Sequence, residues 1–477
     1  MNVNILKYDG KKAVSASAVI IRKSSSLSTI NLSKDEKEFV ATQLKNDKKF
    51  ITINRYNSIV FLIVIDKKNN ANEENELARK AADKLINHLN DLKIKEITVS
   101  APAEKAGLLL AFAEGLALAA YQFLKYFKDA AEKTNSLQAV FVDHKDISKT
   151  QCDELNIIVE ATNTARTLVN EPLSYLTATV LADEITKLGK QAGFKVEVFD
   201  KNRIEALKMG GLLAVNKGSI DPPTFTVLEW KPAKAKNKKP IVFVGKGVVF
   251  DTGGLSLKPT KGSMDLMKSD MAGAAAVAGS IYAIAKAKLP VHVIGLVPAT
   301  DNRPDGNAYV PGDVIKMMSG LNIEVLNTDA EGRMLLGDAL HYAKKYNPEL
   351  VIDLATLTGA AVAAIGKYGI VSMGTANEKQ MSKLAESGNR VFERLAPMPF
   401  WDDYAELLKS DIADMKNIGG PHAGAITAGK FLERFTDYPW IHLDIAGPSF
   451  VEQRDSYRGL GGTGVGVRLL FDFVKNQ

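Results

Sequence analysis

The sequence predicts an α/β protein with two domains: a small N-terminal α/β domain and a larger C-terminal α/β domain whose mostly parallel central sheet is flanked by helices. Two observations support this prediction. The chain has 477 residues, which is too long for one ordinary hydrophobic core. Segments of strand character also alternate with segments of helical periodicity, as is typical of parallel sheets covered by helices on both faces.

The N-terminal domain is expected to cover residues 1–151. Its apolar stretch from Ala106 to Ala120 contains Glu114 and is too short to span a bilayer, so we interpret it as part of a buried helix. The elements predicted here are two strands within residues 51–66, a helix over 75–92, a strand over 94–100, a helix over 103–127 and a strand over 137–143.

A linker helix is predicted over residues 152–171, because apolar residues recur there at helical spacing until Pro172 stops the pattern. The remaining residues, 172–477, form the second and larger predicted domain. Its strands are expected in KVEVFD, TFTVLEW, PIVFVGKGVVFD, PVHVIGLVPAT and LVIDLATL, with helices between them. Ligands of such sheets bind at the carboxyl ends of the strands.

The composition is that of a soluble globular protein, with 46% hydrophobic and 24% charged residues. The net charge of +6 comes from residues 1–150. This basic region keeps a DNA-binding or regulatory role open, although its scattered lysines also fit a solvated surface. Cys152 is the one cysteine, which fits a reducing compartment. The first residues, MNVNILKYDGKK, contain no apolar signal segment, so we expect a cytoplasmic protein.

The segment PIVFVGKGVVFDTGGLSLKP places Lys246 inside an apolar run and Asp251 at its end, beside a Gly-Gly turn. A buried carboxylate is costly unless it is paired or binds a cation. A buried lysine must also reach solvent, find a partner or lose its proton. A Lys246–Asp251 ion pair and a cation site both remain open at this point. The pair would need a bulge or turn, because residues five positions apart point to opposite faces of a regular strand.

Two later segments carry further carboxylates. Asp270 precedes an Ala/Gly-rich helix in MDLMKSDMAGAAAVAG, where it is either a helix cap or a site residue. In NTDAEGRMLLGDAL, Asp329, Glu331 and Arg333 recur at every second position. On an extended chain these three project to one side, which gives a cation site with an anion-binding guanidinium beside it. The alternative is a surface salt-bridge loop, which the strand-like segment before it and the apolar helix after it argue against.

The candidate site therefore contains four carboxylates and one lysine, without a histidine or cysteine cluster of metal-ligand spacing. Oxygen-dominated ligation suits two bridged divalent ions rather than a structural zinc. The sequence has no GxxxxGK[ST] phosphate loop and no GxSxG serine elbow, and the glycines of VGKG lack the GxGxxG continuation. The histidines stand alone and are interpreted as structural: His88, His144, His292, His341, His422 and His442.

At these residues the chain resembles the leucyl aminopeptidases, also called cytosol aminopeptidases. NTDAEGR (327–333) is similar in full to that family's signature, and VGKGVVFDTGGLSLKP and MDLMKSDMAGAAAV are similar to its metal-binding segments. MGGLLAVNKGS, DLATLTGA, NIGGPHAGAITAGKFLERF and IHLDIAGPSF add to the resemblance, which covers the whole second domain. In the first domain the best match is AEGLALAAYQFLKY (113–126).

The resemblance implies two divalent metal ions per subunit, Zn²⁺ or Mn²⁺, with Mg²⁺ or Co²⁺ as further candidates. Asp251 and Glu331 would bridge both ions, and Asp329 would complete one site. Asp270 and the amine of Lys246 would complete the other. A neutral lysine ligand needs a strongly lowered pKa, which two adjacent cations supply by repulsion. The resemblance thus favours shared metal coordination over a direct Lys246–Asp251 pair.

The implied reaction is hydrolysis of the N-terminal peptide bond, with leucine or another apolar first residue preferred and a water bridging the metals. Lys258 would polarise the scissile carbonyl and stabilise the gem-diolate. Arg333 would hold a bicarbonate ion that serves as general base. The free α-amine of the substrate would ligate one metal. The residues implied in substrate binding are Met267, Thr356, Gly359 and Ala446, which would line an apolar pocket, and Leu357, which would offer backbone contacts.

One departure lies between Lys258 and Asp270, where this chain carries one residue more than the family pattern, around Thr260-Lys261-Gly262. It affects the expected rim of the pocket but not the ligands. The resemblance further implies a homohexamer. An inactive structural relative is the third hypothesis, and the complete set of ligand, lysine and arginine positions argues against it.

Overall fold

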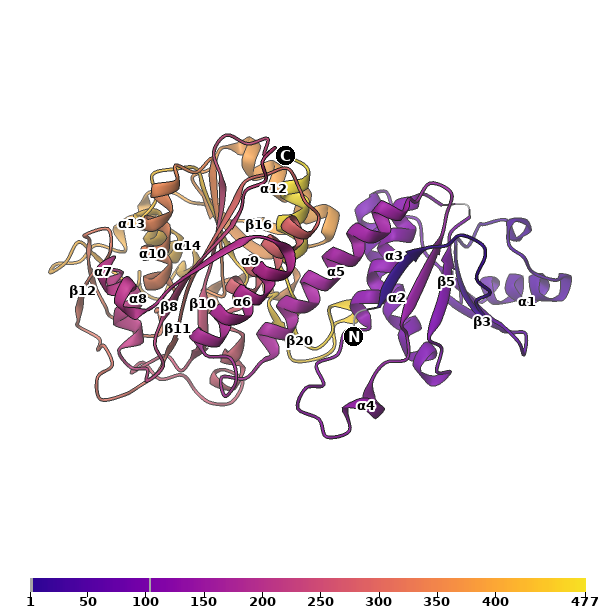
Figure 1. Cartoon of the computed structure of the whole chain (residues 1–477), viewed down its shortest axis with the longest axis horizontal. Coiled ribbons are helices and arrows are strands. Elements are labelled where there is room, and N and C mark those ends of the chain that lie inside the picture. Colours follow the sequence, from indigo (N-terminus) through magenta and orange to yellow (C-terminus); the bar gives the residue numbers. More distant parts are fainter. Residues whose placement is uncertain (1–2, 103) are drawn as a thin grey trace. The chain divides into compact units, whose positions relative to one another are not determined.

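The computed structural model describes residues 3–102 and 104–477, which divide into two compact units (Figure 1). Unit 1 comprises Met1–Asn163 and the segment Gln453–Gly459, and unit 2 comprises Thr164–Glu452 and Leu460–Gln477. Both units are α/β, which confirms the predicted fold class. The predicted linker helix, residues 152–171, overlaps α5 (Lys149–Asn170) except for its last residue, and α5 contains the point where the chain passes from unit 1 to unit 2.

Unit 1 contains a six-stranded mixed sheet in the order β1-β6-β5-β2-β4-β3, in which β3 and β4 are antiparallel and the other described pairs are parallel. Its strands are β1 (Asn4–Lys7), β2 (Ala16–Ile21), β3 (Phe50–Asn54), β4 (Ile59–Val64), β5 (Glu96–Ser100) and β6 (Ala139–Asp143). Its helices are η1 (Leu27–Thr29), α1 (Lys34–Lys45), α2 (Ala71–Asp91), α3 (Ala106–Ala119), α4 (Ala130–Lys133), η5 (Ser456–Arg458) and most of α5.

Both faces of this sheet are buried, as β4 shows. Phe61 and Ile63 pack into the apolar cluster that contains α2 and α3, whereas Leu62 packs with Val40 and Leu44 of α1 on the other face. Figure 1 shows α1 and the α2–α3 pair on opposite sides of these strands.

Helix α3 ends at Ala119, so the predicted helix over residues 103–127 is too long at its C-terminal end. Ala120 is the last buried residue of the apolar run, and the rings of Tyr126 and Phe127 are more than half exposed. The segment after Ala120 therefore has no core to pack on, and tertiary burial decides where a helix of this kind ends.

The segment Gln453–Gly459 belongs to unit 1 although it comes from the far end of the chain. The hydroxyl of Tyr457 donates a hydrogen bond of 2.9 Å to Glu76 on α2, and Tyr457 is fully buried. Arg454 forms an ion pair with Asp83 on the same helix. Unit 1 is therefore assembled from two distant parts of the sequence.

Unit 2 contains a nine-stranded sheet in the order β16-β15-β18-β14-β9-β11-β8-β7, with β10 paired to β11. Its core is parallel, and the antiparallel pairs are β15–β18, β11–β8 and β8–β7. These strands are β7 (Lys195–Phe199), β8 (Thr224–Trp230), β9 (Ile241–Gly245), β10 (Gly247–Asp251), β11 (Val293–Asn302), β14 (Leu350–Ala355), β15 (Ile370–Gly374), β16 (Leu395–Pro397) and β18 (Trp440–Asp444). Two small sheets contain β12 (Val314–Lys316), β13 (Asn322–Glu324) and β17 (Met415–Lys416), and β19 (Phe450–Val451) and β20 (Gly461–Gly462).

Helices cover both faces of the nine-stranded sheet, with α6 and α9 on one side and α10 and α14 on the other (Figure 1). The α-helices of unit 2 are α6 (Ala178–Ala192), α7 (Lys201–Ala206), α8 (Gly210–Asn216), α9 (Ala272–Lys286), α10 (Gly332–Ala343), α11 (Gly359–Ile365), α12 (Glu378–Val391), α13 (Asp403–Glu406), α14 (Gly424–Glu433) and α15 (Val467–Lys475). The 3₁₀ helices are η2 (Met264–Ser269), η3 (Lys344–Tyr346) and η4 (Gly366–Tyr368). Within the described part of the chain, no helix combines the length and apolar character needed to cross a membrane.

Candidate active site

The predicted site residues meet at the carboxyl ends of the parallel strands of unit 2. Lys246 separates β9 from β10, and Asp251 is the last residue of β10. Asp270 lies between η2 and α9, and Asp329 and Glu331 precede α10. Ligand sites of open α/β sheets form at this edge, so the fold brings together side chains that are far apart in the sequence.

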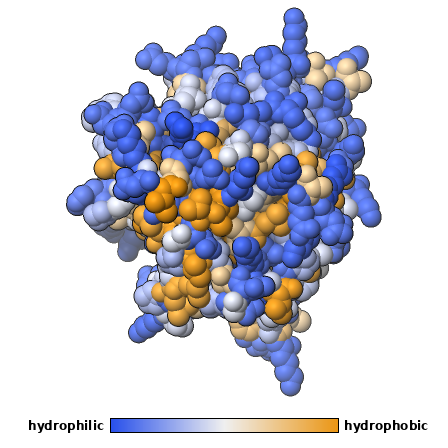
Figure 2. All heavy atoms as spheres, turned by 90° about the vertical axis from the view of Figure 1, so that its left-hand side faces the viewer, coloured by the Kyte–Doolittle hydropathy of each residue, from blue (hydrophilic) through white to orange (hydrophobic). Residues whose placement is uncertain are grey.

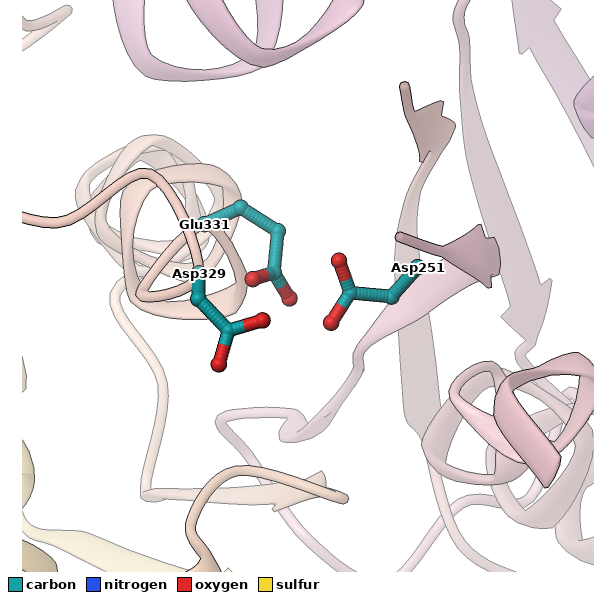
Figure 3. Close-up of side chains that lie close together, drawn as sticks. All are labelled: Asp251, Asp329 and Glu331. Carbon is teal, nitrogen blue, oxygen red and sulfur yellow. The ribbon is translucent and has the colours of Figure 1, made fainter. Parts of the chain in front are cut away.

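Asp251, Asp329 and Glu331 form a carboxylate cluster in which one oxygen from each residue lies within 4.8 Å of the others. Figure 3 shows the Asp251 side chain pointing from its strand toward the other two, which reach it from the opposite side. Asp251 is 2% exposed and Glu331 is 1% exposed. Buried negative charges this close together require cations beside them.

The amine of Lys246 lies inside the site. It donates hydrogen bonds to Oδ1 of Asp270 at 2.8 Å and to the carbonyl of Thr356 at 2.9 Å, and it lies 2.8 Å from Oε1 of Glu331. It can occupy this position because Gly332 has no side chain: a Cβ there would lie 2.5 Å from Cε and 2.7 Å from Nζ of Lys246.

The direct Lys246–Asp251 ion pair, left open by the sequence, is absent from the ion pairs of the described residues. Lys258 takes that place, with its amine 2.9 Å from Oδ2 of Asp251 and in contact with Asp329. The pairing of β10 with β11 shifts register between Val248 and Asp251. Lys246 therefore pairs with Asp270 and Glu331, whereas Asp251 pairs with Lys258.

The structure excludes one alternative that the sequence left open, and it shows that one local prediction was wrong. Asp270 does not cap α9, whose N-cap is Met271, because its carboxylate accepts hydrogen bonds from Lys246 and from the hydroxyl of Thr356 at 2.7 Å. The segment from Asp329 to Arg333 is not extended either. Asp329 lies in a turn and α10 begins at Gly332, so Arg333 is already helical. The turn and the helix start bring the carboxylates together, and regular alternation does not.

Burial dominates the titration of the carboxylates. It raises the pKa of Asp251, with repulsion by Glu331 adding to the effect and attraction by Lys258 opposing it. Burial also raises the pKa of Asp270 well above its ordinary value and raises that of Asp329. The chain by itself therefore holds more negative charge in this space than its lysines neutralise.

The lysine behaves differently from the expectation. Burial lowers the pKa of Lys246, but attraction by Asp270, Glu331 and Asp251 outweighs burial, so the net direction is upward. The lowered pKa that the family resemblance implied depends on cations in the site. Lys258 follows the same pattern: burial lowers its pKa, but attraction by the carboxylates outweighs burial, so its pKa is raised.

The chemistry of these donors fits divalent cations. Oδ2 of Asp270 and Oε2 of Glu331 are buried and have no hydrogen-bond partner among the described residues. Unpartnered buried oxygens in a native fold call for an ion or another ligand. Hard divalent cations prefer such carboxylate oxygens.

Arg333 forms no ion pair with these carboxylates in the described part of the chain. Its Nη1 donates a hydrogen bond of 2.7 Å to the carbonyl of Asn417, its Nε has no partner among the described residues, and burial lowers its pKa to about 10. The Asn417 side chain also bonds to Leu326 and Asn327. Asn417, which sequence reasoning missed, thus ties Arg333 to the loop that precedes Asp329.

A pocket of about 400 Å³ opens onto the carboxylate cluster. It is lined by both lysines and by all four carboxylates, and also by each residue predicted to bind substrate: Met267, Thr356, Leu357, Gly359 and Ala446. Lys261 is exposed and does not line it. No histidine lines the pocket or joins the carboxylate cluster within the described chain.

Sequence reasoning also missed residues that support the site. Asn302, at the end of β11, donates hydrogen bonds to Asp251 at 2.9 Å and to the carbonyl of Thr328 at 3.0 Å. Asp444, at the end of β18, binds the loop after β14. Both residues could have been predicted, because each is a polar residue at the end of an apolar strand, as Asp251 is. Asp444 ends IHLD and Asn302 ends VPATDN.

These observations define a two-unit α/β protein whose larger sheet carries a cluster of carboxylates and lysine, with a chemistry that suits cations, beside a pocket. Residues 163–471 match the model of the catalytic domain of the cytosol aminopeptidase family, and residues 57–129 match that of its N-terminal domain. The chain belongs to the cytosol aminopeptidase family.

Individual relatives agree with this. The probable cytosol aminopeptidase of Chlorobaculum parvum is 54% identical over 323 residues, which span 67% of this chain and 63% of that protein. The probable cytosol aminopeptidase of Chlorobium limicola is 45% identical over 421 residues, 83% of each chain. Among solved structures, tomato leucine aminopeptidase, as a mutant, aligns with a TM-score of 0.87 at 26% identity, covering 100% of this chain and 97% of that one. The bottromycin maturation enzyme BotP in complex with Mn aligns with a TM-score of 0.86 at 29% identity, covering 97% and 99%.

Proposed function

We propose that this chain is a metal-dependent aminopeptidase that hydrolyses the N-terminal peptide bond of peptides and prefers leucine or another apolar first residue. The observation that carries the proposal is the cluster of Asp251, Asp329 and Glu331, the first and last of them buried, which lines the pocket. Family membership supports it independently. We further propose a cytoplasmic location, in keeping with the name of the family.

Five residues would hold two divalent cations, Zn²⁺ or Mn²⁺ in the first place: Lys246, Asp251, Asp270, Asp329 and Glu331. When bound, the cations supply Lewis-acid activation of water and of the scissile carbonyl. The protein would supply orientation. Asn302 fixes the carboxylate of Asp251, and Thr356 fixes that of Asp270.

The two remaining charged residues would act on the substrate. Lys258 is anchored to Asp251 and Asp329, and its side chain is 15% exposed, so it borders the pocket as a fixed cation. It would polarise the scissile carbonyl and stabilise negative charge on its oxygen. Arg333, with its unpartnered Nε, would hold bicarbonate, and the bicarbonate would accept the proton of the attacking water.

The pocket would select the substrate. Met267 and Ala446 offer apolar surface for the first side chain, while Leu357 would contact the peptide backbone. A free α-amine offers a nitrogen ligand to one cation, which would restrict hydrolysis to N-termini.

The test is hydrolysis of a leucine anilide by chelated protein, before and after addition of Mn²⁺ or Zn²⁺. Cleavage should return with metal, fail with the N-acetylated anilide, and be lost in Asp329→Ala. Asp403→Ala removes a carboxylate from an exposed position and is the matched control. Absence of turnover with every metal would refute the proposal.

The proposed assembly is a homohexamer. Figure 2 shows hydrophobic residues gathered on the face of unit 2 that lies at the left of Figure 1, where β12 and α13 are labelled. Exposed apolar residues of these elements and their flanks include Val314, Trp401 and Leu407. Light scattering should give six times the mass of the chain.

The DNA-binding alternative is weaker. Lysines of unit 1 lie in ion pairs, Lys12 with Glu96 at 2.6 Å and Lys49 with Asp66 at 2.7 Å, so part of the positive excess is already matched. Duplex binding that falls steeply with salt would support this role.

A further inference from the structure

A buried polar column runs along one face of the large sheet toward the pocket. The parallel pairing of β14 and β18 places Asp353 opposite His442 and Ala355 opposite Asp444. Trp440, His442 and Asp444 alternate along β18, so they point to the same face. Asp353, His442 and Asp444 are each at most 1% exposed. Three buried titratable groups therefore follow one another along this face, and Asp444 is the one nearest to the pocket-lining residues.

Far from the pocket, the members of the column bond to one another. Asp353 accepts a hydrogen bond from the indole of Trp440 at 2.6 Å, and its other oxygen lies 2.6 Å from Nδ1 of His442. Burial lowers the pKa of His442, but attraction by Asp353 and Asp444 outweighs burial and raises it, against repulsion by Arg333. Both carboxylates therefore favour the protonated form of His442.

The upper end of the column holds two walls of the pocket together. The Asp444 carboxylate accepts hydrogen bonds from the amide of Leu357 at 3.1 Å, the hydroxyl of Thr358 at 2.7 Å and the amide of Ala446 at 3.1 Å. The first two donors follow β14 and the third follows β18. Leu357, Thr358 and Ala446 all line the pocket.

Thr358 extends this control to helix α11. Its hydroxyl accepts a hydrogen bond of 3.0 Å from the amide of Ala361 and so caps the helix while donating to Asp444. Gly359 and Val362 of α11 also line the pocket. One hydroxyl therefore couples the orientation of Asp444 to a helix that forms part of the pocket wall.

A purely structural role would not require a charged group here, because an amide or hydroxyl can also join two loops. Asp444 uses a full carboxylate with three donors, all of them from pocket-lining residues. Burying that charge is costly, and the His442–Asp353 pair beneath it offsets part of the cost. Burial raises the pKa of Asp444, whereas attraction by His442 and the three hydrogen bonds opposes this rise, and the same hydrogen bonds hold the carboxylate in one orientation.

We propose that Asp444 is a positioning residue for the substrate, which fixes the Leu357–Thr358 backbone against Ala446 and thereby sets the width of the pocket for the first side chain. This inference rests on the proposed aminopeptidase function. Asp444 acts through the residues that it holds and does not touch the reacting atoms.

The test compares Mn²⁺-loaded wild type with Asp444→Asn, Thr358→Val and the double variant, on leucine and alanine anilides. The asparagine keeps the shape but replaces one acceptor oxygen with an amide that cannot accept from Thr358. We expect KM for the leucine anilide to rise at least tenfold in each single variant with kcat reduced less, and the preference for leucine over alanine to narrow. The double variant should be no worse than the poorer single variant, because both changes break one coupled interaction. Thr358→Ser, which keeps the hydroxyl, should recover part of the loss.

Manganese content and melting temperature are measured on every variant, and Asp403→Asn is the exposed control. Wild-type KM and selectivity in both single variants would overturn the inference, and so would an equal loss on both anilides accompanied by loss of manganese. If Asp444→Asn does not fold, Thr358→Val and Thr358→Ser still decide the question. An inactive wild type would refute the proposed function itself, and this inference with it.

Discussion

Replacing Gly332 with alanine tests whether the amine of Lys246 must sit where the structure places it. The added Cβ would lie 2.5 Å from Cε of Lys246 and 2.7 Å from its amine. Carbon atoms in contact are normally about 3.5–4.0 Å apart, so the lysine has to move by about 1 Å. The backbone of Gly332 is held by α10, whose first residue it is, so the lysine rather than the helix should yield.

The size of the effect follows from what the amine would lose. Its contacts to Asp270 and Glu331 are 2.8 Å long, and a shift of about 1 Å takes them beyond hydrogen-bonding range. A hydrogen bond to a charged group contributes about 1.5–3 kcal/mol. We expect loss of the proposed nitrogen ligand, taken as similar in strength to such a contact, to weaken metal binding by about 3 kcal/mol. This corresponds to roughly 100-fold weaker binding of Mn²⁺.

Calorimetric titration of chelated protein with Mn²⁺ measures that affinity, and leucine anilide hydrolysis should fall in parallel. Gly107→Ala is the matched control, because Gly107 also lies in the first turn of a helix, α3, and nothing lies within 4 Å of its added Cβ. Gly332→Ala protein that binds Mn²⁺ and hydrolyses the anilide like wild type would refute the reasoning.

Two further predictions concern buried charges. Burial raises the pKa of Asp338 to about 7 although the amides of Leu212 and Met318 donate to its carboxylate. Because the unfolded chain releases this proton near pH 3.9, the free energy of unfolding should fall as pH rises from about 4 to about 7, by at most ~4 kcal/mol from this group. Asp338→Asn should lose that dependence in denaturant titrations, and an unchanged pH dependence in the variant would count against it. For Arg333→Met, we expect kcat to fall by about 10²-fold or more and added bicarbonate to have no effect on the rate; a stimulation equal to that of wild type would exclude the proposed anion site.

The sequence indicated a carboxylate site because some of the proposed ligand positions carry a local mark. Asp251 closes an apolar strand beside two glycines, and Lys246 interrupts the same apolar run. Such groups are costly to bury without a partner, so their chemistry is visible before any fold is known. The fold class was also predictable. A sheet covered by helices on both faces has almost continuously apolar strands, and these strands alternate with helices along the sequence.

Orientation was harder to predict, because it depends on partners that are distant in the sequence. The spacing of Asp329, Glu331 and Arg333 suggested one extended face, but the start of α10 turns Arg333 toward Asn417. Asp444 was missed because its hydrogen-bond partner Leu357 lies 87 positions earlier in the chain.

The discontinuity of unit 1 has a consequence for its synthesis. Ribosomes release the N-terminal residues first, yet the partners of Glu76 and Asp83 on α2 include Tyr457 and Arg454, which leave the ribosome after almost all of unit 2. Domains generally fold during synthesis in N-to-C order. Helix α2 can nevertheless contact Tyr457 and Arg454 only after most of unit 2 has been synthesised. A fragment that ends at Asn163 therefore lacks part of the interior of unit 1, which is complete only after Gln453–Gly459 has been synthesised.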